Sequence, residues 1–321
     1  MKYLGSSAFM LSLSLVAALF TNLTSIFPAT LLTPPVRSVL TIFLLALMLT
    51  LALSRIPGSN LNPFRHPGTL VRGLLMGLVI PAIMPVIGYL ILKHTAYADY
   101  ATGLIFIAAA PFAASVVPLS LILRGDMVYA AQSTLYVYAA ALIWIPAVAY
   151  VFLGTLVDMQ ALVLTVFSVI GVPLIVSRFI MHIALDRAKL AAVLNCVIFF
   201  LVWLSVSAAD FKSAGVGILL VFMLIIMVRT FGLGIAVNYL DQRAGIGWSQ
   251  RVTDILMVSY KNKGIAIALC VATMGPRIPY AMVAIAASIV MEICWVIYMD
   301  SVLFSAKKMN AATHETAMHP V

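Results

Sequence analysis

The segment Met257–Gly264, MVSYKNKG, sets two lysines into an apolar run that extends from about residue 252 to residue 274. One lysine near the centre of a membrane-spanning helix costs roughly 2.5–3.5 kcal/mol on insertion scales, so Lys261 and Lys263 together require a compensating structure. We expect a break in the helix at this segment, because unwound backbone is tolerated in a membrane only where protein covers it or it lines a polar cavity. Such breaks hold substrates and coupling ions in many transporters.

The composition of the chain predicts an all-α polytopic membrane protein. Of its 321 residues 64% are hydrophobic and 9% are charged, and the mean hydropathy is +1.14. The net charge of +9 comes from basic residues scattered singly between apolar runs, which indicates membrane topology and not a nucleic-acid-binding tract. The cysteines Cys196, Cys270 and Cys294 have no CxxC or Cys/His spacing, so we expect no disulfide, no metal site and no cofactor.

Apolar segments of spanning length predict ten transmembrane helices. They lie at about 7–28, 37–53, 69–92, 102–123, 127–153, 160–180, 190–208, 214–239, 247–274 and 280–304. Lys2 is followed by a long apolar segment without a cleavage site, so the N-terminus is expected to be a spanning helix and not a removed signal peptide.

The predicted helices divide into two sets of five. A set of five helices begins on one side of the membrane and ends on the other, so the second set starts from the opposite side. If the second half repeats the structure of the first, its orientation in the membrane must therefore be inverted. We expect a first repeat over residues 1–155, a second, inverted repeat over 156–305 and a polar tail over 306–321.

The basic residues are distributed unequally between the two sides of this arrangement. One side holds Lys2, Arg55, Arg65, Arg72, Arg124, Arg178, Arg187, Lys189, Arg243, Arg251, Lys307 and Lys308, whereas the other holds Arg37, Lys93, Lys212 and Arg277. The positive-inside rule therefore predicts that both termini are cytoplasmic, and we expect a bacterial inner (plasma) membrane protein.

The fourth predicted helix carries a second interruption. Its sequence AAAPFAASVVPLSLILRGD, residues 108–126, contains Pro111 and Pro118 at the place that matches YKNKG in the other half. Paired breaks at corresponding positions indicate a transport site between the repeats, with an ordinary proline kink as the alternative for Pro118. After this helix we expect Gly125 to permit the turn and Asp126 to cap helix five.

Three segments resemble the bile acid:sodium symporter family, within the bile acid/arsenite/riboflavin transporter superfamily. APFAASVVPLSLILRGDMVYAAQST, 110–134, resembles the region where a Pro-Gly-Gly-x-x-Ser-Asn run leads to a Leu-Ala-(Lys/Arg)-Gly-Asp end. VSYKNKGIAIAL, 258–269, resembles the ninth-helix run Glu-Val-Gly-Met-Gln-Asn-Ser-Gly-Leu-Ala, and LALMLTLALSR, 45–55, is similar to a Met-Gly-Leu-Thr-Leu segment. The resemblance implies ten helices in inverted repeats, with broken helices 4 and 9 crossing, and a core of helices 3–5 and 8–10 moving against a panel of helices 1, 2, 6 and 7. It also implies alternating-access transport of a small organic anion.

The departures from the family pattern fall on residues that hold sodium in the family. The Ser-Asn pair becomes Val116 and Val117, a helix-five serine becomes Ala130, and the glutamate and glutamine of helix nine become Met257 and Lys261. A hard cation needs oxygen ligands, so we expect ligand binding to be independent of sodium. A sodium-coupled symporter with a relocated ion site stays open as an alternative.

The candidate substrate- and ion-binding residues are the polar and charged groups placed near the two breaks: Lys261, Asn262, Lys263, Thr134, Ser115, Glu292 and Arg229. Lys261 stands where the family has a sodium ligand and could act as a built-in cation that attracts an anion. It could also exchange a proton during transport, with Glu292 of helix ten as the candidate nearby carboxylate, so the transporter is expected to be proton-coupled or uncoupled. The alternative is a buried pair of Arg229 and Glu292 that locks helix eight to helix ten, with Lys263 reaching back to water.

Other chemistry finds little support in the sequence. The histidines lie in predicted loops or in the tail, and no Walker A loop or HExxH motif is present, so we expect a protein that is not an enzyme. The expected partners are a small organic anion, the lipid bilayer and, in the proton-coupled case, protons, but no nucleic acid. Arsenite efflux stays as an alternative, although residues 101–126 lack a cysteine, and so does a non-transporting membrane sensor.

Overall fold

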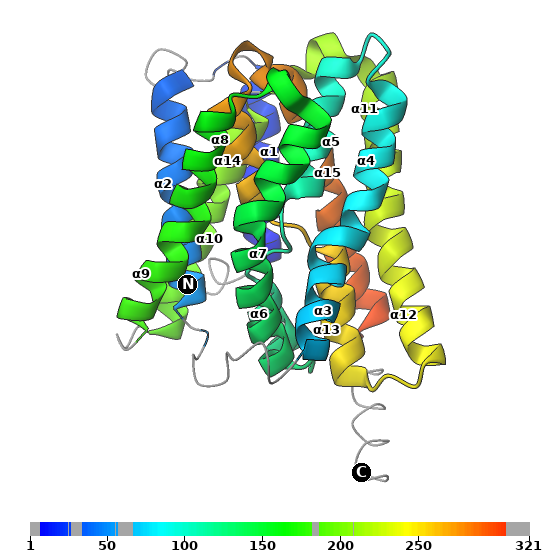
Figure 1. Cartoon of the computed structure of the whole chain (residues 1–321). Helices are drawn as coiled ribbons and strands as arrows, with labels where there is room; N and C mark the ends of the chain where they lie inside the picture. Colours follow the sequence, from blue (N-terminus) through cyan, green and yellow to red (C-terminus); the bar gives the residue numbers. More distant parts are fainter. Residues whose placement is uncertain are drawn as a thin grey trace.

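The computed structural model describes residues 7–24, 26, 34–54, 56, 67–181, 186–207 and 209–305. In these residues the regular structure is helical, and the helices run side by side along one axis (Figure 1). The predicted tail over 306–321 and the basic residues Lys2, Arg55 and Arg65 lie outside the described residues.

The α-helices, in chain order, are α1 (Ser7–Leu23), α2 (Pro34–Leu53), α3 (Pro67–Leu74), α4 (Ile80–Leu92), α5 (Ala98–Ala109), α6 (Val116–Ile122), α7 (Met127–Leu153), α8 (Met159–Val166), α9 (Val172–Ile180), α10 (Arg187–Val206), α11 (Phe211–Met227), α12 (Leu233–Arg243), α13 (Trp248–Ser259), α14 (Lys263–Thr273) and α15 (Ile278–Tyr298). The π-helical turns η1 (Leu75–Val79), η3 (Phe167–Gly171) and η4 (Val228–Gly232) join α3 to α4, α8 to α9 and α11 to α12, and η6 (Met299–Leu303) extends α15. Short 3₁₀ turns, η2 (Gly154–Leu156) and η5 (Gly275–Arg277), follow α7 and precede α15.

Six helical stretches of the described chain are long and apolar enough to cross a membrane. They are Val36–Leu53, Pro67–Leu92, Met127–Leu156, Met159–Ile180, Phe211–Arg243 and Gly275–Leu303. The other four predicted spans coincide with shorter helices, and two of those, at 102–123 and 247–274, are interrupted. The expected all-helical membrane fold is confirmed at this level.

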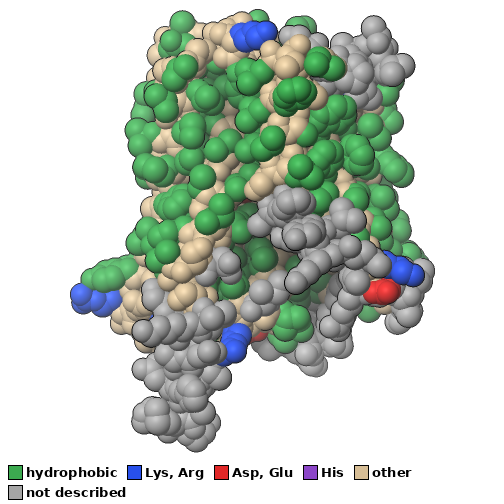
Figure 2. Space-filling model, turned by 180° about the vertical axis from the view of Figure 1, so that it is seen from behind, with side chains coloured by type: hydrophobic (Ala, Val, Ile, Leu, Met, Phe, Trp, Pro, Cys, Tyr) green, Lys and Arg blue, Asp and Glu red, His purple; other side chains and the backbone are tan. Residues whose placement is uncertain are grey.

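The outside of the bundle is apolar. Large side chains such as Ile143 and Phe179, both 77% exposed, point away from the core, and hydrophobic atoms cover most of the face seen in Figure 2. Lys and Arg side chains on this face lie toward its two ends (Figure 2). An apolar band with charged ends is the surface that a lipid bilayer stabilises, and the chain is an integral membrane protein.

The helices form two sides, and the short helices α5 and α14 pack against them. In Figure 1, α2, α8 and α9 lie on the left, whereas α3, α4, α11, α12 and α13 lie on the right. α14 packs against α2 and α8, and α5 packs against α4 and α15. The short helices α5 and α14 are thereby buried, which places their broken ends inside the protein.

The turn between α6 and α7 corrects one detail of the sequence prediction. Asp126 caps α7 as expected, since its side chain accepts a hydrogen bond from the Tyr129 N–H at 2.9 Å. The left-handed residue of the turn is Arg124, with φ of 55°, and not Gly125. Gly125 is needed for another reason, because a Cβ there would lie 2.8 Å from the Thr253 hydroxyl oxygen on α13.

Candidate functional site

The two helix breaks meet each other inside the bundle. An isolated antiparallel bridge joins the segment between α5 and α6 to the segment between α13 and α14. The Ala113 N–H donates to the Tyr260 carbonyl at 2.9 Å, and the Asn262 N–H donates to the Pro111 carbonyl at 2.8 Å. Each break therefore satisfies backbone polar groups of the other, which is what allows unwound backbone at this depth.

The interruption of the fourth predicted helix could be a true break or a kink caused by Pro118, and the position of Pro118 distinguishes the two. The helix ends at Ala109 and resumes at Val116, so the interruption precedes Pro118. Pro118 lies in the first turn of α6, where a missing N–H removes no intrahelical hydrogen bond. The kink attributed to Pro118 is therefore not the cause of the interruption.

Lys261 is the most enclosed cation of the second break, with 1% of its surface exposed. Its Nζ donates to the carbonyls of Gly77 at 3.1 Å and Ala110 at 2.5 Å, and its backbone N–H donates to Glu292 Oε1 at 3.2 Å. Gly77 lies in η1, where an added Cβ would come within 2.8 Å of the Phe112 ring. The ammonium thus links η1 to the break that follows α5, and Gly77 lets the Phe112 ring pack closely against η1 at the same place.

Glu292 of α15 joins three cationic residues through one oxygen. Its Oε1 lies 2.8 Å from Arg229 Nη2 and 2.6 Å from Lys263 Nζ, and it also accepts the Lys261 N–H. We call these four residues the crossing cluster. The predicted proximity of Arg229 and Glu292 is confirmed, whereas Lys263, with an 11% exposed side chain, turns inward to Glu292 and does not reach back to water.

Arg229 keeps unused hydrogen-bonding capacity although its side chain is fully buried. Its Nη2 donates to the Thr230 hydroxyl at 2.6 Å and to the Ser259 carbonyl at 3.1 Å, at the C-terminal end of α13. A helix C-terminus carries partial negative charge and so stabilises a cation there. Its Nε and Nη1 are buried and have no hydrogen-bond partner in the described part of the chain.

Asn262 serves as the N-cap of α14. Its Oδ1 accepts the Ile265 N–H at 3.1 Å, and its Nδ2 donates to the Tyr138 hydroxyl at 2.7 Å. That hydroxyl donates in turn to the Phe112 carbonyl at 3.0 Å. Sequence reasoning missed Tyr138, and the only signal for it was its place one helical turn after Thr134 on the same helix.

The two predicted hydroxyl residues lie apart from the crossing cluster. Thr134 is fully buried, and its hydroxyl donates to the Ala130 carbonyl of its own helix at 2.7 Å. Ser115 is half-buried and interacts with the Tyr260 hydroxyl. Among the described hydrogen bonds, neither side chain reaches the crossing cluster.

The positions aligned with the family's sodium ligands are filled by apolar packing. Val116, Ala130 and Met257 are each 0% exposed. Side chains of carbon, hydrogen and thioether sulfur at these positions provide no hard oxygen ligand. The residues present therefore do not fit the sodium sites that the resemblance implies.

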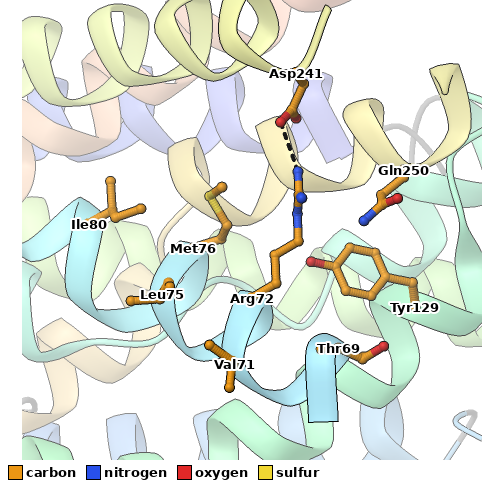
Figure 3. A pocket seen from close by; sticks show the side chains of 10 residues that line it. Thr69, Val71, Arg72, Leu75, Met76, Ile80, Tyr129, Asp241 and Gln250 are labelled. Carbon is orange, nitrogen blue, oxygen red and sulfur yellow. Dashed lines mark hydrogen bonds and ion pairs between the residues drawn. The ribbon is translucent and has the colours of Figure 1, made fainter. Parts of the chain in front are cut away.

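A second ionic group, which we call the end cluster, comprises Arg72, Tyr129, Asp241 and Asp254. Arg72 Nη2 lies 2.8 Å from Asp241 Oδ1 and 2.6 Å from Asp254 Oδ2, and the Tyr129 hydroxyl donates to Asp254 Oδ1 at 2.8 Å. Figure 3 shows Arg72 reaching from α3 toward Asp241. Sequence reasoning used Arg72 only for topology and missed both aspartates, although carboxylates within apolar helices are themselves a signal.

Comparison with known proteins gives one family. A family model described as Sodium Bile acid symporter family matches residues 38–217, more than half of the chain. No curated protein matches the chain. The matched range includes the first helix break and Gly77, while Arg229, the second break and Glu292 lie beyond it.

Proposed function

Because the chain belongs to the sodium bile acid symporter family, a family of transporters and not of enzymes, we propose that it carries a small organic anion by alternating access. In this proposal the protein has ten transmembrane helices in two inverted repeats, 1–155 and 156–305. It lies in a bacterial inner membrane with both termini in the cytoplasm. The moving core consists of the third to fifth and eighth to tenth helices, and the remaining four form the panel.

Two pairs of irregularities support the inverted repeat. The fourth and ninth predicted helices are both broken, as α5–α6 and α13–α14. The third and eighth both contain a π-helical turn, η1 and η4, and these turns carry Gly77 and Arg229. Irregular turns at corresponding places in two halves are typical of transporters whose site lies between the repeats.

The excess of cationic over acidic residues in the crossing cluster is the observation that favours an anion as the substrate. Arg229 and Lys263 share the carboxylate of Glu292 inside an apolar bundle, and the ammonium of the third cationic residue, Lys261, is held by backbone carbonyls and pairs with no carboxylate of the described residues. Charges buried in such surroundings need compensation, and two nitrogens of Arg229 have no hydrogen-bond partner among the described residues. A carboxylate or sulfonate that approaches this cluster supplies the missing negative charge.

The position of the Lys261 ammonium supports a transport cycle that does not use sodium. Its ammonium occupies a place between two backbone carbonyls, where a bound metal cation would also be held by oxygen atoms. A covalently attached cation needs no ion gradient to fill its place, so transport is uncoupled or driven by protons. In this proposal Lys261 and Arg229 set the positive potential, and Lys263, the more exposed lysine, meets the anion first.

A thermal-shift screen followed by uptake tests this function. Purified protein is screened with small mono- and dicarboxylates and sulfonates, each beside its uncharged amide, in sodium and in choline buffer of equal ionic strength. Anions that bind the folded state should raise the melting temperature, and their amides should not. Uptake of the anion that stabilises the protein most is then measured in proteoliposomes that contain the protein.

Matched variants make the outcome specific. Lys261→Gln should weaken stabilisation by the anion, whereas Lys93→Gln, the same change at an exposed lysine outside the cluster, should leave it unchanged. Equal stabilisation by the anions and their amides would contradict the assignment of the substrate class. Binding without any movement of the anion into vesicles, by exchange or by net uptake, would instead favour the membrane sensor.

A further inference from the structure

A cavity of about 640 Å³ lies beside the end cluster. Its walls come from α3, η1, α4, α7, α12 and α13, and three residues of the end cluster, Arg72, Tyr129 and Asp241, line it (Figure 3). Neither the transport proposal nor the crossing cluster uses this cavity. Its lining is mostly apolar and includes one acidic side chain, Asp241, together with residues from the first turns of two helices.

Asp241 is the acidic group of the lining. Its side chain is 8% exposed, and only its Oδ1 is engaged, by Arg72. Its Oδ2 is buried without a hydrogen-bond partner among the residues that the structure describes. Because Asp241 and Asp254 share the one guanidinium, one negative charge remains, and a ligand ammonium could both balance this charge and donate to Oδ2.

Residues from the first turns of two helices also line the cavity. Gly68 and Thr69 in the first turn of α3 line the cavity, as does Gln250 in the first turn of α13. The N–H groups of a first helical turn have no intrahelical partners, and the helix dipole favours an anion at this end. Two first turns that border one cavity suit a phosphate group.

An apolar strip leads from the cavity along the outside of the third predicted span. Val71 and Leu75 line the cavity, and Val79 and Ile83 continue the strip at intervals of four residues. These four side chains are 55%, 43%, 40% and 49% exposed. Residues four apart lie on one helix face, so the strip can hold a hydrocarbon chain that runs along the helix.

We propose that this cavity binds a phospholipid whose headgroup carries a primary ammonium, such as phosphatidylethanolamine. The ammonium donates to Asp241 Oδ2, the phosphate meets the N-termini of α3 and α13, and an acyl chain follows the strip from Val71 to Ile83. A lipid is favoured over a free zwitterion because the lining of the cavity is mostly apolar and continues into the outward-facing apolar strip. A trimethylammonium headgroup has no N–H to donate, so phosphatidylcholine fits less well.

Native mass spectrometry of the full-length protein in detergent tests this proposal directly. Equal amounts of phosphatidylethanolamine, phosphatidylcholine and phosphatidylglycerol with identical acyl chains compete for the protein. The first lipid should be retained about tenfold more than each of the others, which corresponds to about 1.4 kcal/mol. Asp241→Asn should reduce this ratio to about one or two, because an amide presents no negative charge to the ammonium.

Asp99→Asn is the matched control for the headgroup preference. Asp99 is an exposed aspartate at the start of α5, outside the end cluster, so its replacement should leave the preference intact. Equal retention of the three lipids by the parent protein would overturn the proposal even if Asp241→Asn failed to fold. An unchanged preference in folded Asp241→Asn would overturn it as well.

Glycerophosphoethanolamine separates the lipid from a free headgroup. This compound carries the phosphate and the ammonium but no acyl chain. It should displace the bound lipid only at concentrations at least about a hundredfold higher than those of the intact lipid, because it cannot bury the apolar strip. Displacement at equal concentration would identify a site for a soluble zwitterion and overturn the assignment to a lipid.

Discussion

The crossing cluster and the end cluster are built from similar side chains with opposite balances of charge. The crossing cluster has three cations and one carboxylate, whereas the end cluster has one guanidinium, two carboxylates and a tyrosine. The first lies where two broken helices meet, and the second borders a cavity. The comparison indicates that each site selects the charge it lacks: an anion at the crossing and an ammonium at the end.

The largest effect should follow from removing the single carboxylate of the crossing cluster. Glu292→Leu leaves the Arg229 guanidinium and the Lys263 ammonium without their shared carboxylate and should lower the free energy of unfolding by about 3–5 kcal/mol. Combining it with Arg229→Met should cost less than the sum of the two single changes, because fewer unpaired charges remain. Denaturant unfolding in detergent measures both. Strictly additive losses would show that the two residues do not act as a pair.

Lys261 should matter for binding more than for folding. Lys261→Gln removes a buried charge, so the variant should fold at least as well as the parent, while affinity for the anion should fall by about 1.5–3 kcal/mol. Lys261→Arg sharpens the comparison, since arginine keeps the charge but does not release a proton. It should bind the anion yet fail to respond to a pH gradient if Lys261 exchanges protons. Parent-like affinity and uptake in both variants would remove Lys261 from the site.

A smaller effect is expected at the end cluster from Tyr129→Phe. This change removes the donor to Asp254 Oδ1 and should lower the free energy of unfolding by about 1–2 kcal/mol. Tyr136→Phe on the same helix is the control, because the Tyr136 hydroxyl is buried and has no partner among the described residues. Its removal should be neutral or slightly stabilising. A greater loss from Tyr136→Phe than from Tyr129→Phe would contradict this account of the end cluster.

The smallest effect should come from exchanging sodium for choline. The apolar residues Val116, Ala130 and Met257 offer no oxygen ligand, so anion affinity should change by less than tenfold, or about 1.4 kcal/mol. Isothermal titration in the two buffers at fixed ionic strength measures it. A larger sodium requirement would place a coupling ion elsewhere in the protein and would weaken the view that Lys261 replaces it.

The sequence predicted features that depend on local composition. It did not predict most of the features that depend on contacts between residues far apart in the chain. The breaks at Pro111 and at Lys261 were predictable because prolines and lysines are costly inside a spanning helix. The Arg229–Glu292 pair followed from the need of buried charges for partners, although 63 residues separate them. By contrast, Arg72 is 169 residues from Asp241 and 182 from Asp254, and no local pattern indicates that they meet.

The missed parts of the crossing have a similar cause. Lys261 is held by the carbonyls of Gly77 and Ala110, and every residue carries a carbonyl, so side-chain identity says nothing about this role. Tyr138 was missed because its hydroxyl bonds a helix break that is formed by other segments. The turn residue was misassigned to Gly125 because glycine usually adopts positive φ, whereas here Arg124 does.

The pairing of the two breaks has a consequence for synthesis of the protein. The Ala110 carbonyl precedes its partner Lys261 by 151 residues. At about 5–20 residues per second, the ribosome needs roughly 8–30 s to make that length of chain. During this interval the first break stays in the translocation machinery or the membrane without the backbone groups that later satisfy it. The first half therefore cannot reach its final structure on its own during synthesis. The protein completes its folding only after the ninth predicted helix has been inserted.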